Sequence, residues 1–185
     1  MEKNKVKILF LDRNAVGPYE LKRIFSKYGE YTELNLTNND DVASYLKDYD
    51  VVILNRIRLG KKEFEKAPHL KLVLLTGTGY NHIDLVAAKE YGVTIANVAN
   101  YSTNSVSQLT MTLLLNELTR AERLSQEVKQ NKWEEISNKM DRYYHVDTED
   151  KVLGILGHGN IGKRVEQYAK SFGMEVMIAK IPGRE

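Results

Sequence analysis

Residues 152–162, VLGILGHGNIG, constrain the fold of this 185-residue chain more than any other segment. A short apolar run leads into the pattern Gly157-x-Gly159-x-x-Gly162, and an amphipathic stretch and a second apolar run follow. This order predicts a strand, a tight turn, a helix and a parallel strand. The free N–H groups at the start of such a helix favour phosphate, so we expect a nucleotide site here. A glycine turn that serves the fold alone is the alternative.

The sequence ends at Glu185, just after the second strand of this unit. A complete dinucleotide-binding domain has about six parallel strands with helices on both faces. Two strands and one helix leave apolar faces uncovered. We therefore expect this sequence to be the N-terminal portion of a larger protein, with exposed apolar surface around residues 152–179.

Charge and cysteine content exclude several classes of function. Lys and Arg total 27 and Asp and Glu total 25, and the basic residues are scattered. This balance gives no electrostatic reason to expect a nucleic acid or a membrane as partner. The chain has no cysteine and no pair of histidines at metal-binding spacing, so we expect no metal site. Without a signal peptide or a membrane-length apolar run, a cytoplasmic location is expected.

Short apolar runs alternate with helical patterns over the first hundred residues. Such alternation implies parallel pairing, and right-handed crossovers favour an open sheet. We expect an α/β protein, with a flavodoxin-like parallel-sheet domain over residues 1–98 and the start of a Rossmann dinucleotide-binding domain over residues 99–185. The strands of the first domain are predicted at residues 6–11, 31–36, 51–54, 72–75 and 93–98.

A long helical pattern follows and extends to about Val128. Met111 and Leu115 lie off its main apolar stripe, so the helix is apolar over more than half its circumference, which is typical of burial between domains or subunits. The polar segment 130–150 predicts an extended arm with aromatic anchors, and a surface loop is the alternative. The stripe consists of Val106, Leu109, Leu113, Leu114 and Leu118.

The segment TGTGYNHID, residues 76–84, follows a predicted strand and precedes a helix. Two glycines in a tight loop at the carboxyl end of a strand let backbone N–H groups converge on an anion. Ligands of open α/β sheets collect at that edge. The loop is therefore a candidate anion site, and an ordinary strand–helix connection is the alternative. Asp12, at the end of the first strand, is expected to face the same cleft or to serve a turn.

Three stretches together carry a family resemblance: VLLTGTGYNHIDLVAAKEYGVTIANV, YSTNSVSQLTMTLLL and KVLGILGHGNIGKRVEQYAKSFGMEV. In this order and spacing they closely resemble the D-isomer-specific 2-hydroxyacid dehydrogenases, especially the glycerate dehydrogenase and hydroxypyruvate reductase branch. The resemblance is strong over about residues 50–180 and loose before them. It implies an oxidoreductase that transfers a hydride between NAD or NADP and C2 of a small D-2-hydroxy or 2-oxo acid, such as hydroxypyruvate or glyoxylate.

The same resemblance implies the domain organisation and the partners. Residues 1–98 would be the N-terminal part of a substrate domain that is built from both chain ends, and the nucleotide domain would be inserted after it. Members form homodimers through the helix at residues 103–128 and the following arm. The resemblance implies a small acid and a second subunit as partners. It implies no nucleic-acid and no membrane partner.

The resemblance also assigns roles to single residues. One loop lies where members hold the substrate carboxylate, and the loop after the third strand flanks the substrate. The residues expected to bind substrate are Thr78, Gly79, Tyr80 and Arg56. The residues expected to bind cofactor are Thr103, Gly157, Gly159, Asn160, Ile161, Gly162 and Lys180.

Two departures from the family pattern matter. Lys180, with Arg184 nearby, stands where members usually have a carboxylate for the adenosine ribose. A cation attracts a 2′-phosphate, so we hypothesise reduced preference for NAD and use of NADPH; a solvent-facing Lys180 is the alternative. Ala99-Asn100 replaces the Pro-Gly that often precedes Tyr-Ser-Thr, which should loosen the hinge without abolishing function.

No catalytic residue is assigned within this chain. The family's Arg, Glu and His, which polarise the carbonyl and transfer the proton, are expected beyond Glu185, so the chain alone should be inactive. Arg56 and Arg58 would suit a reaction on 3-phosphoglycerate or phosphite instead. A different class of function is a non-catalytic NAD(H)-binding or regulatory module derived from this family.

Overall fold

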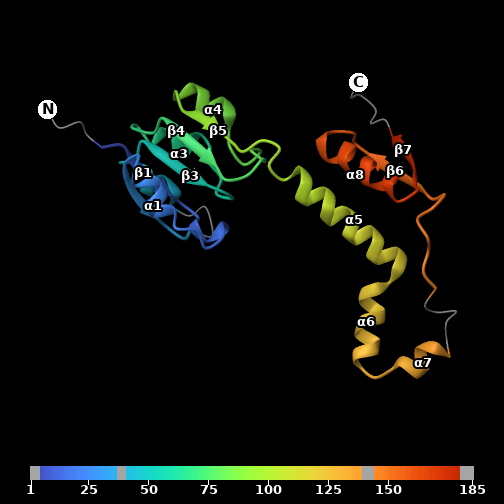
Figure 1. Ribbon diagram of the computed structural model, residues 1–185. Helices are drawn as coiled ribbons and strands as arrows, with labels where there is room; N and C mark the ends of the chain where they lie inside the picture. The colour runs from blue at the N-terminus through green and yellow to red at the C-terminus, as the bar shows by residue number, and fades with distance from the viewer. Residues whose placement is uncertain (1–4, 37–40, 139–143, 180–185) are drawn as a thin grey trace. The chain divides into compact units, whose positions relative to one another are not determined.

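Two units make up the chain, Met1–Ala99 and Asn100–Glu185 (Figure 1). The structure is a computed structural model that describes residues 5–36, 41–138 and 144–179. No helix among these residues is both long enough and apolar enough to cross a membrane. Each hydrophobic cluster of the described residues belongs to one unit, so the units are considered separately below.

The first unit contains five parallel strands in the order β2-β1-β3-β4-β5. This is the flavodoxin-like order that the sequence predicted, and the fold class is confirmed. Because all strands run parallel, their carboxyl ends meet at one edge, where the candidate substrate loops lie. The strands are β1 (Lys7–Phe10), β2 (Glu30–Glu33), β3 (Val51–Leu54), β4 (Leu72–Leu75) and β5 (Thr94–Ala96).

Helices cover both faces of this sheet, because successive side chains of each strand point to opposite faces. The larger cluster joins Leu9 and Val52 to the helices α2 (Val42–Tyr45), α3 (Lys61–Glu65) and α4 (Leu85–Glu90). On the other face, Ile8, Phe10 and Ile53 pack against α1. Helix α1 spans Leu21–Phe25, and a 3-10 turn, η1, spans Arg13–Ala15.

The second unit contains the predicted strand, turn, helix and strand. Strands β6 (Val152–Leu156) and β7 (Glu175–Ala179) pair in parallel, and α8 (Asn160–Ser171) connects them. Helix α5 (Thr103–Thr119) packs along α8 through a cluster formed by Met111, Ile155 and Val165. Large apolar side chains on both strands, including Leu156 and Met177, are exposed, as the sequence predicted.

The prediction of one helix over residues 103–128 was wrong. Helix α5 ends at Thr119, Arg120 adopts a left-handed conformation with φ 54°, and α6 runs from Ala121 to Lys129. At the break, Oδ1 of Asn116 accepts the backbone N–H of Glu122 at 3.0 Å, and the carbonyl of Leu118, which a continuous helix would offer to Glu122, accepts the N–H of Val146 at 3.0 Å.

The segment after α6 is partly helical instead of fully extended. Helix α7 spans Trp133–Ser137 and buries Ile136, while Trp133 is exposed. The ring of Tyr144 is exposed and lies 4.7 Å from the guanidinium of Arg120, so the prediction of aromatic anchors stays a prediction. The third aromatic residue of the predicted arm, Tyr143, lies outside the described residues.

Candidate functional site in two parts

Asp12 organises the carboxyl edge of the first sheet. It follows β1 and is only 5% exposed. Its Oδ1 accepts the backbone N–H of Asn55 at 2.9 Å, and its Oδ2 accepts the backbone N–H of Arg56 at 2.7 Å. Hydrogen bonds to a carboxylate are stronger than neutral ones, so Asp12 fixes the loop that carries Arg56. The sequence suggested a cleft-facing or turn-forming role for Asp12 and missed this one, because the partners are 43 and 44 residues away.

The loops after β3 and β4 are joined to each other. Nδ2 of Asn55 donates to Oγ1 of Thr76 at 2.7 Å. Further along, the N–H of Leu59 donates to the carbonyl of His82, and the N–H of Asp84 donates to the carbonyl of Leu59. The substrate-flanking loop and the candidate anion loop therefore lie side by side at the sheet edge.

The candidate anion loop is exposed, and the residues that directly follow β5 hold it through hydrogen bonds. Oγ1 of Thr78 donates to the carbonyl of Val98 at 3.0 Å, and Nδ2 of Asn97 donates to the carbonyl of Thr78 at 2.8 Å. Thr78, Gly79 and Tyr80 are all exposed. Because the hydroxyl and carbonyl of Thr78 serve to hold the loop, its backbone N–H groups are the donors that it can offer to an anion.

A cavity of about 230 Å³ lies beside Arg56 at the same edge. Its lining combines two asparagines and an arginine with apolar residues. The carboxylate of Asp12 is occupied by backbone donors, so the amides and Arg56 supply the polar character. The lining residues are Asp12, Asn14, Ala15, Asn35, Leu36, Arg56 and Ile57.

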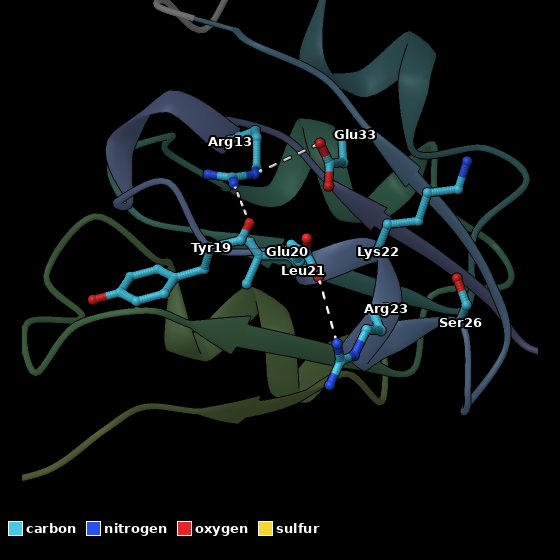
Figure 2. Close-up of a pocket in the computed structure, with 8 residues that line it drawn as sticks. All are labelled: Arg13, Tyr19, Glu20, Leu21, Lys22, Arg23, Ser26 and Glu33. Carbon is cyan, nitrogen blue, oxygen red and sulfur yellow. Dashed lines mark hydrogen bonds and ion pairs between the residues drawn. The ribbon is translucent and has the colours of Figure 1, made fainter.

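A larger pocket, of about 550 Å³, lies over α1 (Figure 2). Figure 2 shows that Arg13 serves local contacts: it donates to the carbonyl of Tyr19 at 2.6 Å and pairs with Glu33 at 3.6 Å. Arg23 pairs with Glu20 at 3.8 Å. None of the expected substrate residues lines this pocket, so size alone does not make it the candidate site.

His82 belongs to the segment 76–84 that forms the candidate anion loop, and its Nε2 is buried without a hydrogen-bond partner among the described residues. Burial lowers the pKa of His82 below its ordinary value of 6.5, and the charge of Arg58 adds to this effect while Asp12 opposes it. The imidazole is therefore neutral near pH 7. Its environment is that of a partly buried, neutral histidine.

In the second unit, the folded chain itself requires two of the three motif glycines, Gly157 and Gly162, for different reasons. Gly157 has φ +97°, a conformation that L side chains rarely adopt. A Cβ on Gly162 would clash with the carbonyl oxygen of Gly157. Gly159 has an ordinary φ of −78°, and a Cβ there would meet nothing within 4 Å. Neither the backbone conformation nor a protein neighbour requires glycine at position 159. The space beside Gly159, at the start of α8, is therefore open.

The start of α8 offers backbone donors to that space. The first bond of the helical ladder runs from the N–H of Lys163 to the carbonyl of Gly159 at 2.9 Å, and no side chain caps the helix. The N–H groups of Asn160, Ile161 and Gly162 therefore lie outside the ladder. Free donors, a positive dipole end and an open cradle are what a dinucleotide pyrophosphate requires, so these residues fit the cofactor.

The structure brings the remaining described cofactor candidates together. Thr103 begins α5 and Asn160 begins α8, and Asn100 bonds to both residues. The backbone carbonyl of Asn100 accepts the N–H of Thr103 at 3.3 Å, and Oδ1 of Asn100 accepts Nδ2 of Asn160 at 2.7 Å. Lys180 and Arg184 lie outside the described residues, so the hypothesis of NADPH use stays a prediction.

His158, inside the glycine motif, contacts α8. Its Nε2 lies 2.5 Å from Oε2 of Glu166, and Nζ of Lys170 lies 2.7 Å from Oε1 of the same carboxylate. The hydrogen bonds from Lys170 and His158 lower the pKa of Glu166. This network occupies the imidazole on the flank of the helix.

A candidate anion loop at a sheet edge in one unit and an open glycine turn in a βαβ unit are together typical of nucleotide-dependent α/β proteins. Residues 8–159 match the family described as D-isomer specific 2-hydroxyacid dehydrogenase, catalytic domain. The chain belongs to this family, which confirms the resemblance found in the sequence.

Two curated relatives illustrate the match. The chain is 34% identical over 179 residues to a hydroxypyruvate reductase of Blautia hydrogenotrophica, covering 93% of this chain and 55% of the relative. It is 30% identical over 178 residues to a putative 2-hydroxyacid dehydrogenase of Haemophilus influenzae, covering 95% of this chain and 56% of the relative. The chain thus spans about half the length of these relatives.

Solved structures show the same fold. An NAD-dependent formate dehydrogenase from Staphylococcus aureus in complex with NAD has a TM-score of 0.76 at 28% identity, covering 94% of this chain and 56% of that one. A D-lactate dehydrogenase from Aquifex aeolicus, complexed with NAD and lactic acid, has a TM-score of 0.79 at 26% identity, covering 96% of this chain and 52% of that one.

Proposed function

We propose that this chain supplies the substrate loop and the cofactor turn of an NAD(P)-dependent D-2-hydroxyacid dehydrogenase. The reaction would be hydride transfer at C2 of a small 2-oxo or 2-hydroxy acid, with hydroxypyruvate and glyoxylate as the leading substrates. The observation that carries this proposal is the turn at Gly159, which leaves three N–H groups of α8 facing open space. The hydroxypyruvate reductase among the relatives and the NAD complexes among the solved structures support it.

In this proposal each unit has one task. Unit Met1–Ala99 is the N-terminal part of the substrate domain, with residue 98 as its expected end, and its loop at Thr78, Gly79 and Tyr80 holds the substrate carboxylate through backbone N–H groups. Arg56 stands beside it as a cation for the substrate. Unit Asn100–Glu185 is the start of the nucleotide domain.

The residues of the second unit bind and orient the cofactor. The amino end of α8 holds the pyrophosphate, and Thr103 contacts the nicotinamide side. A bound nicotinamide supplies or accepts the hydride. We assign no general acid or base to this chain, so it should bind NADH without turning over a 2-oxo acid.

Gly159→Ala tests the cofactor turn. The added Cβ meets no protein atom, so Tm should not change, but it fills the space at the start of α8. We expect NADH, followed by its fluorescence, to bind about tenfold more weakly, a loss of about 1.4 kcal/mol. The same titration with NADPH tests the Lys180 hypothesis, which a strong preference for NADH would contradict.

Gly154→Ala is the matched control. A Cβ at Gly154 also meets nothing within 4 Å, but this residue lies inside β6 and not at the helix start. Gly154→Ala should bind NADH like the wild type. The proposal fails if Gly159→Ala also binds normally, or if the wild-type chain does not bind NADH at all.

We also propose that the chain forms a homodimer through α5 and the arm that follows. Ser107 and Met111 face α8, whereas Leu109 and Leu113 are 57% and 61% exposed on another side of the helix. Together with Val106 they form an apolar stripe at helical spacing, which a second copy could cover.

A further inference from the structure

Asn100 has a backbone conformation that few residues accept. Its φ is 61°, in the left-handed region, where asparagine and glycine are the residues best tolerated. Glycine, which often stands here in the family pattern, would satisfy the backbone equally well. The asparagine side chain therefore needs a separate explanation.

That explanation is a hydrogen bond to the cofactor turn. Oδ1 of Asn100 accepts Nδ2 of Asn160 at 2.7 Å, across 60 residues of sequence. Asn160 is the first residue of α8, and its backbone N–H is one of the donors outside the helical ladder. A glycine at position 100 could not make this bond.

The same residue also holds the start of α5. The backbone carbonyl of Asn100 accepts the N–H of Thr103 at 3.3 Å. A second connection lies one turn further on, where the fully buried hydroxyl of Ser107 bonds the carbonyl of Thr103 at 2.6 Å and approaches the carbonyl of Ile161 at 3.5 Å. The first turns of α5 and α8 are thus joined at two points.

We propose that Asn100 is a positioning residue for the cofactor site. Its carbonyl and its side chain hold the first residues of α5 and α8, and these carry the proposed contacts to the nicotinamide side and to the pyrophosphate. One residue therefore sets both contacts together. The ligand in this inference rests on the proposed function, whereas the effect of Asn100 on the first turn of α8 does not.

Two variants separate the side chain from the backbone. Asn100→Gly keeps the left-handed conformation and removes the hydrogen bond. Asn100→Asp keeps an acceptor for Nδ2 of Asn160 and adds a negative charge beside the turn. Amide hydrogen exchange of Lys163, whose N–H makes the first bond of α8, reports on the turn without any cofactor. We expect exchange about fivefold faster in Asn100→Gly and unchanged in Asn100→Asp.

NADH titration of the same proteins gives the second readout. Asn100→Gly should raise the Kd about fivefold at every salt concentration, because it loosens the turn. Asn100→Asp should weaken binding by repulsion of the pyrophosphate, and added salt should restore most of the loss. In the double variant Asn100→Gly/Asn160→Ala, the effect should not exceed that of either single change, since both remove the same bond.

The outcomes separate this inference from the proposed function. Unchanged exchange of Lys163 in Asn100→Gly would overturn the inference, and so would faster exchange with an unchanged Kd. If the wild-type chain fails to bind NADH, the proposed function fails, and the exchange comparison still decides whether Asn100 holds the turn.

Discussion

Asp12 and His82 are polar side chains at the sheet edge of the first unit, and they differ in how their buried atoms are hydrogen-bonded. Asp12 receives two backbone N–H groups, which compensate the loss of water around its carboxylate. Nε2 of His82 is buried and has no partner among the described residues. An imidazole in that situation is stable only while it is neutral, so the folded state resists protonation at this position.

The pH dependence of stability should reveal His82. Its pKa is lowered in the folded state, so the unfolded chain takes up a proton at a higher pH than the folded chain does. Protonation then favours unfolding, and stability should fall as pH drops below about 6.5. We expect the Tm of His82→Asn to change less between pH 7.5 and pH 5.5 than that of the wild type.

His69→Asn is the control for this comparison, because His69 is exposed. It should keep the wild-type pH dependence of Tm. Equal slopes for the wild type and His82→Asn would show that His82 does not cause the acid sensitivity.

Among the elements, loops are tied to strands through side chains that lie far away in the sequence. Asp12 ties the end of β1 to the loop after β3, and Asn55 ties that loop to the residue after β4. Thr78 and Asn97 complete the series at β5. The shape of the proposed substrate edge therefore depends on this series of hydrogen bonds as well as on the sheet.

Asp12→Asn should weaken the first link of the series. The amide oxygen can accept one backbone N–H, but the NH₂ group then faces the second donor. Leaving a buried donor unsatisfied costs about 1–3 kcal/mol, and we expect a loss of this size in the free energy of unfolding, measured with urea.

Asp84→Asn provides a matched control. Asp84 caps α4 by accepting the N–H of Ala87 at 2.9 Å, and asparagine caps helices about as well. The free energy of unfolding of Asp84→Asn should fall by less than about 0.5 kcal/mol. Equal losses for the two variants would mean that Asp12 contributes no more than an ordinary exposed cap.

At the scale of the whole molecule, the proposed homodimer rests on the exposed stripe on α5, which consists of Val106, Leu109 and Leu113. The double variant Leu109→Gln/Leu113→Gln removes its two most exposed leucines without touching the face on α8. We expect sedimentation velocity to show the wild type as a dimer and this variant as a monomer at micromolar concentration, because the apolar area is lost.

Leu85→Gln serves as the control, since Leu85 is an exposed leucine on α4. This variant should sediment like the wild type. If the double variant on α5 still forms dimers, the copies meet through another surface, and the exposed side chains of β6 and β7 would be the next candidates.

The sequence alone was enough to predict a flavodoxin-like parallel sheet and the glycine turn. These features depend on short-range signals: continuous apolar runs for β1, β3 and β4, and glycines at fixed spacing before α8. It also carried the family resemblance, which the comparison confirms. The assignments of substrate and cofactor residues remain predictions until the binding experiments above are done.

Tertiary structure decided the features that depend on distant or competing hydrogen bonds. The helical pattern through residue 128 could not show that α5 would end at Thr119, where Asn116 accepts the N–H of Glu122. Likewise, nothing local in the sequence pairs Asp12 with Arg56 or Asn100 with Asn160, which are 44 and 60 residues apart. Periodicity records which face of an element is apolar, whereas the partner of a single polar atom is fixed only when the chain has folded.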